Sequence, residues 1–487
     1  MTSVSKSIKL TYVLAVIALL SVGLHWNIWN ADIAGIHAWR QTQTMSVVEN
    51  FASEDMNILN PRINSRGNGD GIMRMEFPLL QWTFAWFYKW FGQNLIIARM
   101  LSFLIFLISL IGFYRLLKAW GKSDIIGATG TWCFAWSPLL FYYSVNPLPD
   151  NLALCFGIWS LVFLKRFQLN ESNLSLVGFG VCLSLATAVK LPFILFGAGF
   201  IPIFLGRVQV SIKETAKSGL ILMLLMAPAV SWYLWVIPQW GNAGIISGIA
   251  ADSGFEYASA MATLWGIFHS MLPELFINFG SVLFFLFGIY HFFSKADSIN
   301  RYTSELFILV ALFLFLIYEV NMIGLQHDYY LFPFLPLIFL VVAAGIEKIL
   351  DSKQVALKYL GVIALVVLPA TAYLRIQGRW SPTEKEIVLL ENKDELRKLI
   401  PDNALVVVGN DPSGHIYLYH LGRKGWTFEQ DWLVASDLNE FVNDGAQFIV
   451  TNTSLVEETE TLNQFLGEPL FDKDGLRVYP LVHLTDS

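Results

Sequence analysis

The chain has 487 residues, of which 55% are hydrophobic and 14% charged, with a mean hydropathy of +0.54 and a formal net charge of −6. This composition excludes a soluble globular protein and predicts a helical protein that crosses a membrane several times. The acidic balance, without a basic patch, argues against a nucleic-acid partner. The three cysteines match no metal or disulfide spacing: Cys133, Cys155 and Cys182.

The first apolar run, about residues 10–29, follows Lys6 and Lys9. A signal peptide has this pattern too, but no small-residue cleavage site follows, so we expect an uncleaved first membrane helix. Ten later runs are also apolar enough to be spans. The eleven predicted spans are 10–29, 95–114, 125–144, 151–164, 174–190, 192–206, 219–237, 275–293, 305–320, 331–347 and 357–373.

Lys and Arg occupy every second connection between these spans. The connections around 145–150, 238–274 and 321–330 contain neither residue. Because positive connections stay in the cytoplasm, the N-terminus is predicted to be cytoplasmic and the residues after the last span to lie outside. The positive side holds Lys6, Lys9, Arg115, Lys118, Lys122, Lys165, Arg166, Arg207, Lys213, Lys217, Lys295, Arg301, Lys348, Lys353 and Lys358.

The segment 77–91 is apolar and aromatic but short, and it contains Gln81 and Lys89. As a span it would reverse the orientation of every later connection, so we expect it to lie at the membrane interface. The first outer loop then covers about residues 30–94, within a transmembrane domain of residues 1–373. Residues 374–487 have short β-rich runs broken by Gly, Asn and Pro, which predict a small α/β domain outside the membrane.

The stretch "IHAWRQTQTMSVVENF" (36–51) opens the first outer loop. If it forms a helix, a period of 3.6 residues puts His37, Arg40, Gln41 and Thr44 on one stripe. Such a stripe either faces a functional site or lies in the lipid headgroup region.

Other polar groups are expected at the outer ends of spans: Asp150 in "SVNPLPDN", Lys190 in "AVKLP", and His327 to Tyr330 in "HDYY". Ionisable residues at membrane depth are often functional. Each also has a structural interpretation: Asp150 as a helix cap, Lys190 reaching to the interface, and the His/Tyr group as an aromatic belt. Together, these cations and acids on one side of the bilayer would suit a lipid-linked anionic substrate and the deprotonation of an acceptor.

Five segments in order give a resemblance to a known class: "EFPLLQW" (76–82), "FGQNLIIARML" (91–101), "NPLPDNLAL" (146–154), "AVKLP" (188–192) and "HDYYLFPFLPL" (327–337). The layout resembles the GT-C membrane glycosyltransferases, specifically bacterial relatives of the protein O-mannosyltransferases and of the lipid A aminoarabinose transferases. One departure concerns the first loop, where "HAWRQTQT" stands in place of the class's acidic pair.

The resemblance implies a multi-pass enzyme of the bacterial inner membrane that transfers a sugar from a polyprenyl-phosphate donor to a hydroxyl of a lipid, glycan or protein, with inversion and general-base catalysis. The base is expected to be Asp32, favoured by the class, or His37. Glu76, which heads the Phe-Pro-Leu turn, and Asp150 are the other catalytic candidates. We expect no cofactor and no metal, because the first loop has no clustered carboxylates.

The donor phosphate is expected to be bound by cations and by hydrogen-bond donors of the late His/Tyr segment. Gln41 is expected to orient a sugar or acceptor hydroxyl. Arg74 lies in a Gly- and Asn-rich part of the first loop that we expect to close over substrate. The predicted phosphate-binding residues are Arg40, Arg74, Lys190, His327 and Tyr330.

Two other functions fit many spans and charged side chains. A transporter or flippase of lipid-linked sugars would have them, but typically with internal repeats and polar groups at mid-depth. A non-catalytic membrane scaffold is the other alternative, because the acidic pair of the first loop is missing.

Overall fold

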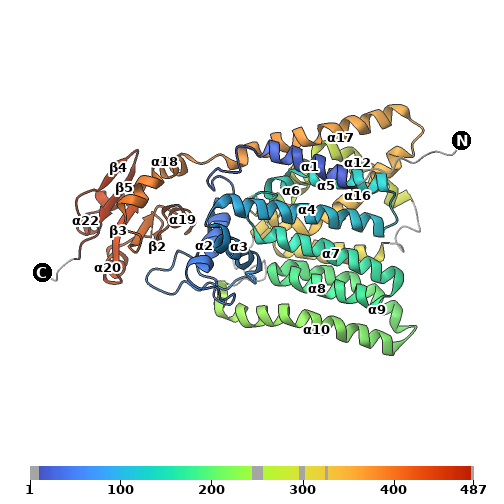
Figure 1. Cartoon of the computed structure of the whole chain (residues 1–487), viewed down its shortest axis with the longest axis horizontal. Helices are drawn as coiled ribbons and strands as arrows, with labels where there is room; N and C mark the ends of the chain where they lie inside the picture. Colours follow the sequence, from blue (N-terminus) through green and yellow to red (C-terminus); the bar gives the residue numbers. More distant parts are fainter. Residues whose placement is uncertain (1–9, 244–255, 295–301, 324–326, 431, 484–487) are drawn as a thin grey trace. The chain divides into compact units, whose positions relative to one another are not determined.

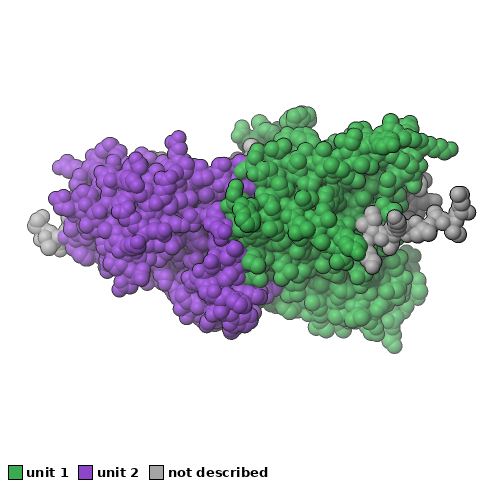
Figure 2. Space-filling view, turned by 45° about the horizontal axis from the view of Figure 1, so that its top comes forward, with its two compact units in different colours: residues 1–29, 75–77, 98–377 green, residues 30–74, 78–97, 378–487 purple. Residues whose placement is uncertain are grey.

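The computed structural model describes residues 10–243, 256–294, 302–323, 327–430 and 432–483. The chain divides into two compact units, which Figure 2 shows in different colours. Unit 1 comprises residues 1–29, 75–77 and 98–377, and unit 2 comprises residues 30–74, 78–97 and 378–487. The predicted connections that hold Lys6, Lys9, Lys295 and Arg301 lie outside the described residues.

Unit 1 is helical, as its apolar composition predicts (Figure 1). Helices α7, α8 and α10 run side by side in it. Its helices are α1 (Leu10–Leu24), α4 (Leu95–Ala119, whose first turn belongs to unit 2), α5 (Asp124–Ala135), α6 (Pro138–Tyr143), α7 (Pro149–Asn170), α8 (Asn173–Val189), η1 (Leu191–Phe200), α9 (Ile201–Val208), α10 (Ile212–Val236), η2 (Ile237–Ala243), α11 (Tyr257–Gly266), η3 (Ile267–Phe276), α12 (Phe279–Ser294), α14 (Thr303–Tyr318), α15 (Val320–Ile323), η4 (Asp328–Phe334), α16 (Leu335–Leu350) and α17 (Val355–Ile376).

Each of the eleven predicted spans coincides with helix, but the count of eleven is not confirmed. Among the described residues, six helices are long and apolar enough to cross a membrane. A bent pair, Tyr257–Phe276 with Phe279–Ser294, would make a seventh, and three shorter apolar helices fall below that length. The chain is therefore a multi-pass membrane protein.

Proline explains several of the interruptions. The predicted span 125–144 breaks into α5 and α6 at Ser137, whose side chain caps the new helix that Pro138 begins. Pro192 and Pro333 lie in the 3₁₀ segments η1 and η4. Since proline removes a backbone donor and clashes with the preceding turn, regular α-helix starts again only beyond it.

Helices α12 and α16 approach each other closely at two glycines. A Cβ added to Gly345 would lie 1.7 Å from the carbonyl oxygen of Phe284, and one added to Gly288 would lie 1.9 Å from that of Val341. Small residues allow such backbone contact between helices in lipid, where van der Waals packing replaces the hydrophobic effect as the force that associates them.

Unit 2 combines the first outer loop with the C-terminal residues. The loop supplies α2 (Ala38–Ser53) and α3 (Leu79–Phe91), and η5 (Gln377–Trp380) leads into the C-terminal part. Its other elements are α18 (Glu384–Leu399), β1 (Leu405–Gly409), α19 (Ile416–Leu421), β2 (Lys424–Phe428), α20 (Ala435–Asn443), β3 (Ala446–Thr451), α21 (Leu455–Glu458), α22 (Glu460–Asn463), β4 (Phe471–Lys473) and β5 (Leu476–Pro480).

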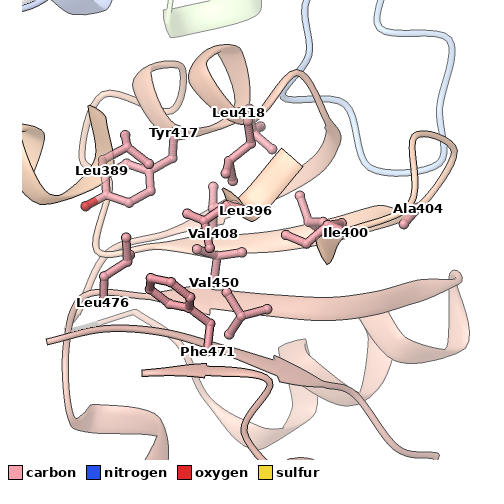
Figure 3. Close-up of a cluster of buried hydrophobic side chains, with 13 residues drawn as sticks. Leu389, Leu396, Ile400, Ala404, Val408, Tyr417, Leu418, Val450, Phe471 and Leu476 are labelled. Atoms are coloured by element: carbon pink, nitrogen blue, oxygen red, sulfur yellow. The ribbon is translucent and has the colours of Figure 1, made fainter. Parts of the chain in front are cut away.

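The five strands form one sheet in the order β2-β1-β3-β5-β4. Strand β1 is parallel to β2 and β3, and β5 is antiparallel to β3 and β4. Val406 and Val408 face one core together with Leu396 of α18 (Figure 3), whereas Val407 faces a second core on the other side of the sheet. A central parallel strand buried on both faces explains why "ALVVVG" is continuously apolar.

The first outer loop covers the β2 edge of this sheet. The Gly425 N–H donates to the Asn64 carbonyl, and the Gly425 carbonyl accepts from the N–H groups of Arg66 (2.9 Å) and Gly67 (2.8 Å). Glu54 forms ion pairs with Arg66 and Lys424. An exposed strand edge is prone to pair with another chain, and here a loop more than 350 residues away in sequence satisfies it.

Candidate functional site

Asp150 lies in the first turn of α7, where Pro149 begins the helix. The turn before it is fixed by the Asn151 side-chain amide, which donates to the carbonyls of Tyr143 and Asn146. The carboxylate is 1% exposed and faces Lys190, with 3.3 Å between Oδ1 and Nζ. Among the described residues, its Oδ2 has no hydrogen-bond partner. A buried carboxylate oxygen left in this way is suited to accept a proton or a hydrogen bond from a ligand.

Lys190 lies between α8 and η1, in extended backbone. Its ammonium is 4.8 Å from the ring centroid of Tyr330 and 5.4 Å from that of Tyr329. The two rings stack with 5.3 Å between their centroids. Asp150 and the tyrosine faces therefore hold the cation in place by charge and cation–π attraction.

The late His/Tyr segment forms η4 and the residue before it. Asp328 and Tyr329 are 1% and 2% exposed, which excludes a simple aromatic belt at the surface for these two residues. Asp328 accepts a hydrogen bond of 2.8 Å from the Tyr143 hydroxyl, and the ring of His327 lies 5.6 Å from that of Tyr330.

Glu76 belongs to a short segment, residues 75–77, that is bound to the end of α8. The Phe77 N–H donates to the Ala188 carbonyl at 2.9 Å, and the Trp232 indole donates to the Met75 carbonyl at 3.0 Å. Glu76 thus lies beside residues 188–190. Unit 1 therefore gathers five of the predicted residues at one place: Glu76, Asp150, Lys190, His327 and Tyr330.

Glu319 joins this group, although the sequence analysis did not select it. It follows α14, is 8% exposed, and interacts electrostatically with Lys190. Its signal in the sequence is an acid at the outer end of the predicted span 305–320. Lys190 consequently has carboxylates from two different segments around it, Asp150 of α7 and Glu319 after α14, so this part of unit 1 holds more acid than base.

The remaining predicted residues lie in unit 2. Asp32 forms an ion pair with Lys393 of α18, and the next carbonyl, of Ile33, accepts from Nε2 of His420 at 2.9 Å. Burial lowers the pKa of His420 to about 4, so the ring is neutral at pH 7 and donates one N–H to this carbonyl. The segment with Asp32 is therefore bound to the C-terminal residues.

The predicted helix at 36–51 is confirmed as α2, with His37 as its N-cap in the left-handed region (φ 61°). The whole predicted stripe is buried, with exposures between 0% and 5% for His37, Arg40, Gln41 and Thr44. The alternative interpretation, in which this polar stripe lies in the lipid headgroup region, is therefore wrong.

Arg40 is connected to the C-terminal residues through one glutamine. Its guanidinium donates to the Gln43 side-chain oxygen, and the Gln43 amide lies 3.1 Å from Nε2 of His415. Burial and the nearby Arg40 charge lower the pKa of His415 to about 4, so its neutral ring can accept from the amide. The contact between Gln43 and His415 was not predicted from the sequence, since 372 positions separate the two residues.

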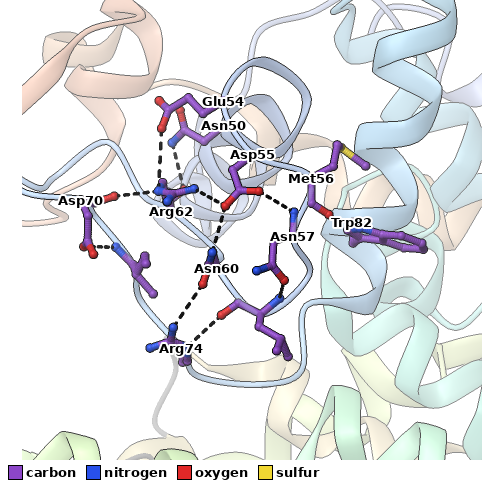
Figure 4. A network of polar contacts seen from close by, with 12 residues as sticks. Asn50, Glu54, Asp55, Met56, Asn57, Asn60, Arg62, Asp70, Arg74 and Trp82 are labelled. Atoms are coloured by element: carbon purple, nitrogen blue, oxygen red, sulfur yellow. Dashed lines mark hydrogen bonds and ion pairs between the residues drawn. The ribbon is translucent and has the colours of Figure 1, made fainter.

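Arg74 lies in a network of polar contacts within the first outer loop (Figure 4). It donates to the Leu59 carbonyl at 2.8 Å and to the Asn60 side chain at 3.3 Å. Asp55 binds both Asn60 and Arg62, and these contacts lower its pKa to about 2. The Gly- and Asn-rich stretch is thus internally bonded around its arginines.

No group of three metal-binding side chains is found in the part of the chain that the structure describes. The absence of a metal from the reaction stays a prediction.

Comparison with solved structures gives a match over the full length. The structure of ArnT from Cupriavidus metallidurans bound to undecaprenyl phosphate superposes with a TM-score of 0.68 at 11% identity, covering 97% of this chain and 98% of that one. The chain has the GT-C fold. The sequence-based prediction of this fold class is therefore confirmed.

Two further GT-C structures are similar. The Archaeoglobus fulgidus oligosaccharyltransferase AglB, in complex with an inhibitory peptide and a dolichol-phosphate, matches with a TM-score of 0.55 and 12% identity over 94% of this chain and 72% of that one. The mycobacterial arabinofuranosyltransferase AftD matches with a TM-score of 0.57 and 14% identity over 99% of this chain and 40% of that one.

A family model described as dolichyl-phosphate-mannose-protein mannosyltransferase matches residues 76–235. This range begins at Glu76 and contains Asp150 and Lys190. Comparison with curated proteins gives no match.

Proposed function

We propose that this protein transfers a sugar from a polyprenyl-phosphate donor to an acceptor hydroxyl, with inversion, on the outer face of a bacterial inner membrane. The observation that carries the proposal is the buried Asp150–Lys190 pair in a GT-C fold, close to two tyrosine rings and with one carboxylate oxygen that has no hydrogen-bond partner among the described residues. The ArnT structure with undecaprenyl phosphate supports a lipid phosphate as part of the donor.

In this reaction the acceptor oxygen attacks the anomeric carbon while the bond from that carbon to the phosphate oxygen breaks. The bonding electrons leave with the polyprenyl phosphate, and the acceptor proton passes to a carboxylate. We assign that proton to Asp150, whose Oδ2 has no partner among the described residues. Asp32, the base that the class resemblance favours, forms an ion pair with Lys393 in unit 2.

Lys190 is assigned to the departing phosphate, since its ammonium lies 3.3 Å from the proposed base and can give a phosphate oxygen a charge-assisted hydrogen bond. With the Asp150 and Glu319 carboxylates around it, this lysine does not by itself balance an additional anion. The expected roles of Arg40 and Arg74 at a phosphate and of Gln41 at a hydroxyl concern residues of unit 2 and stay predictions.

Binding of undecaprenyl phosphate to the purified full-length protein in detergent tests the phosphate assignment. Lys190→Ala is expected to weaken binding at least about tenfold, because a charge-assisted hydrogen bond is lost. Lys217→Ala is the matched control, since the side chain of this lysine is 54% exposed and, among the described residues, its ion pair is with Glu214 of its own helix. Equal affinities of the two variants would remove Lys190 from the site.

The same preparation separates an enzyme from a flippase. Undecaprenyl-phosphate-linked hexoses and pentoses are supplied with a membrane lipid and glycan extract as acceptor. Release of undecaprenyl phosphate supports transfer, whereas movement of an intact donor across a vesicle membrane without release would contradict it.

A further inference from the structure

A polar pocket of about 480 Å³ lies in unit 1 at the other end of α16 from η4. It is formed by the connection between α4 and α5, the end of α12, the residue before α14, and the connection between α16 and α17. Its charged and aromatic lining includes Trp120, Lys122, Tyr302, Glu347, Lys348 and Asp351. Since α16 has 16 residues, about 24 Å of helix separates this pocket from the η4 end.

Lys122 lines the pocket and is 6% exposed. Its ammonium pairs with Glu347, with 2.6 Å between Nζ and Oε2. Glu347 is its one acceptor among the described residues, so two of its three N–H donors are available to a ligand. A buried ammonium is costly unless its donors are satisfied, which favours an anionic group beside it.

The rim adds charges of both signs. Lys348 and Asp351 are exposed and line the pocket. Lys348 follows Glu347 in the last turn of α16, and Asp351 is the residue after this helix. Two ammonium groups and two carboxylates within one cavity do not complement a purely anionic ligand. They complement a ligand that carries a phosphate and an ammonium a few bonds apart.

The surroundings of the pocket are those of a lipid headgroup site. Trp120 and Tyr302 pack edge to face with 6.0 Å between their ring centroids, and such amphipathic rings favour the level of the headgroups. Phe293 of α12 and Tyr359 of α17, each within two residues of a lining residue, are 89% and 68% exposed. Exposed rings of this size on a membrane protein give acyl chains a surface to cover.

We propose that this pocket binds the headgroup of a zwitterionic phospholipid with a free amine, phosphatidylethanolamine. Lys122 and Lys348 bind its phosphate, and Glu347 and Asp351 bind its ammonium. The connections that form the pocket are those whose Lys and Arg predict a cytoplasmic position, so the lipid belongs to the inner leaflet. The inference concerns a site separate from Asp150 and Lys190 and is independent of the proposed transfer reaction.

Native mass spectrometry of the full-length protein tests the proposal, with phosphatidylethanolamine, phosphatidylglycerol and water-soluble O-phosphoethanolamine as probes. Phosphatidylethanolamine is expected to bind at least about tenfold more tightly than either of the others. Equal affinity for phosphatidylglycerol would contradict the ammonium contacts, and equal affinity for O-phosphoethanolamine would contradict a lipid as the occupant.

Two rim variants keep the test independent of folding, because Lys348 and Asp351 are exposed. Lys348→Ala is expected to weaken binding of both phospholipids about tenfold. Asp351→Asn is expected to weaken only phosphatidylethanolamine and so to abolish the preference. Lys217→Ala, on another predicted cytoplasmic connection, is the control. Retention of wild-type affinity and preference in both rim variants would overturn the proposal.

Discussion

Gly35 holds the segment with Asp32 against the C-terminal residues, and its replacement gives a sharp test of unit 2. Its backbone is left-handed (φ 76°), and an added Cβ would lie 2.4 Å from the Arg379 carbonyl oxygen. That oxygen accepts the Ile36 N–H at 2.8 Å. In Gly35→Ala the left-handed strain is about 1–2 kcal/mol, and displacement of the carbonyl weakens a hydrogen bond of about 1 kcal/mol.

The expected loss for Gly35→Ala is therefore about 2–3 kcal/mol, which lowers the unfolding midpoint of a unit of this size by about 4–12 °C. The assay is thermal unfolding of the full-length protein in detergent. It is combined with protease digestion, which reports cleavage in the segment that contains Asp32 and in the C-terminal residues of unit 2. Gly378→Ala is the matched control, because a Cβ there meets nothing within 4 Å. If both variants unfold at the same temperature, the segment is not bound as described.

Three further predictions concern packing, pH and the base. Gly345→Ala is expected to destabilise unit 1 by about 1–3 kcal/mol in a thermal unfolding assay. Gly206→Ala is the control, because a Cβ added there meets nothing within 4 Å. Equal unfolding midpoints of the two variants would contradict the close approach of α12 and α16. Since folding lowers the pKa of His420 to about 4, the unfolded chain binds the extra proton, and the stability of the fold decreases as the pH drops from 6.5 towards 4. His420→Gln should reduce the difference between the unfolding midpoints measured at pH 7 and pH 5. An unchanged difference would refute this prediction. Asp32→Asn and Lys393→Ala should lower transfer by the same small factor, because they break one ion pair; complete loss in Asp32→Asn alone would make Asp32 the base.

Local patterns predicted most of the architecture. The polar stretch 36–51 is a helix, the eleven apolar runs coincide with helices, and the broken β-rich runs of the C-terminal region form a sheet. Periodicity and length are properties of neighbouring residues, so a single sequence contains them. The long spans were nevertheless interrupted at prolines such as Pro138 and Pro333, where one missing donor decides between continuous and broken helix.

Contacts between distant segments were beyond the sequence. Nothing near Asp32 indicates that its partner is Lys393, 361 positions later, and nothing near Gln43 points to His415. The edge of β2 is covered by a loop from the other end of the chain. The predicted sides of the membrane placed Glu76, Asp150, Lys190 and the His/Tyr segment together. The proximity of Glu319 to Lys190 became apparent only from the fold.

The proposed reaction rests most directly on Asp150. The decisive measurement is the turnover of undecaprenyl-phosphate-linked hexoses and pentoses by Asp150→Asn, with Asp444→Asn, an exposed aspartate, as control. Loss of a general base predicts a fall of about 10²- to 10⁴-fold in turnover, larger than any change in undecaprenyl-phosphate binding. Transfer by Asp150→Asn at the wild-type rate would contradict the account.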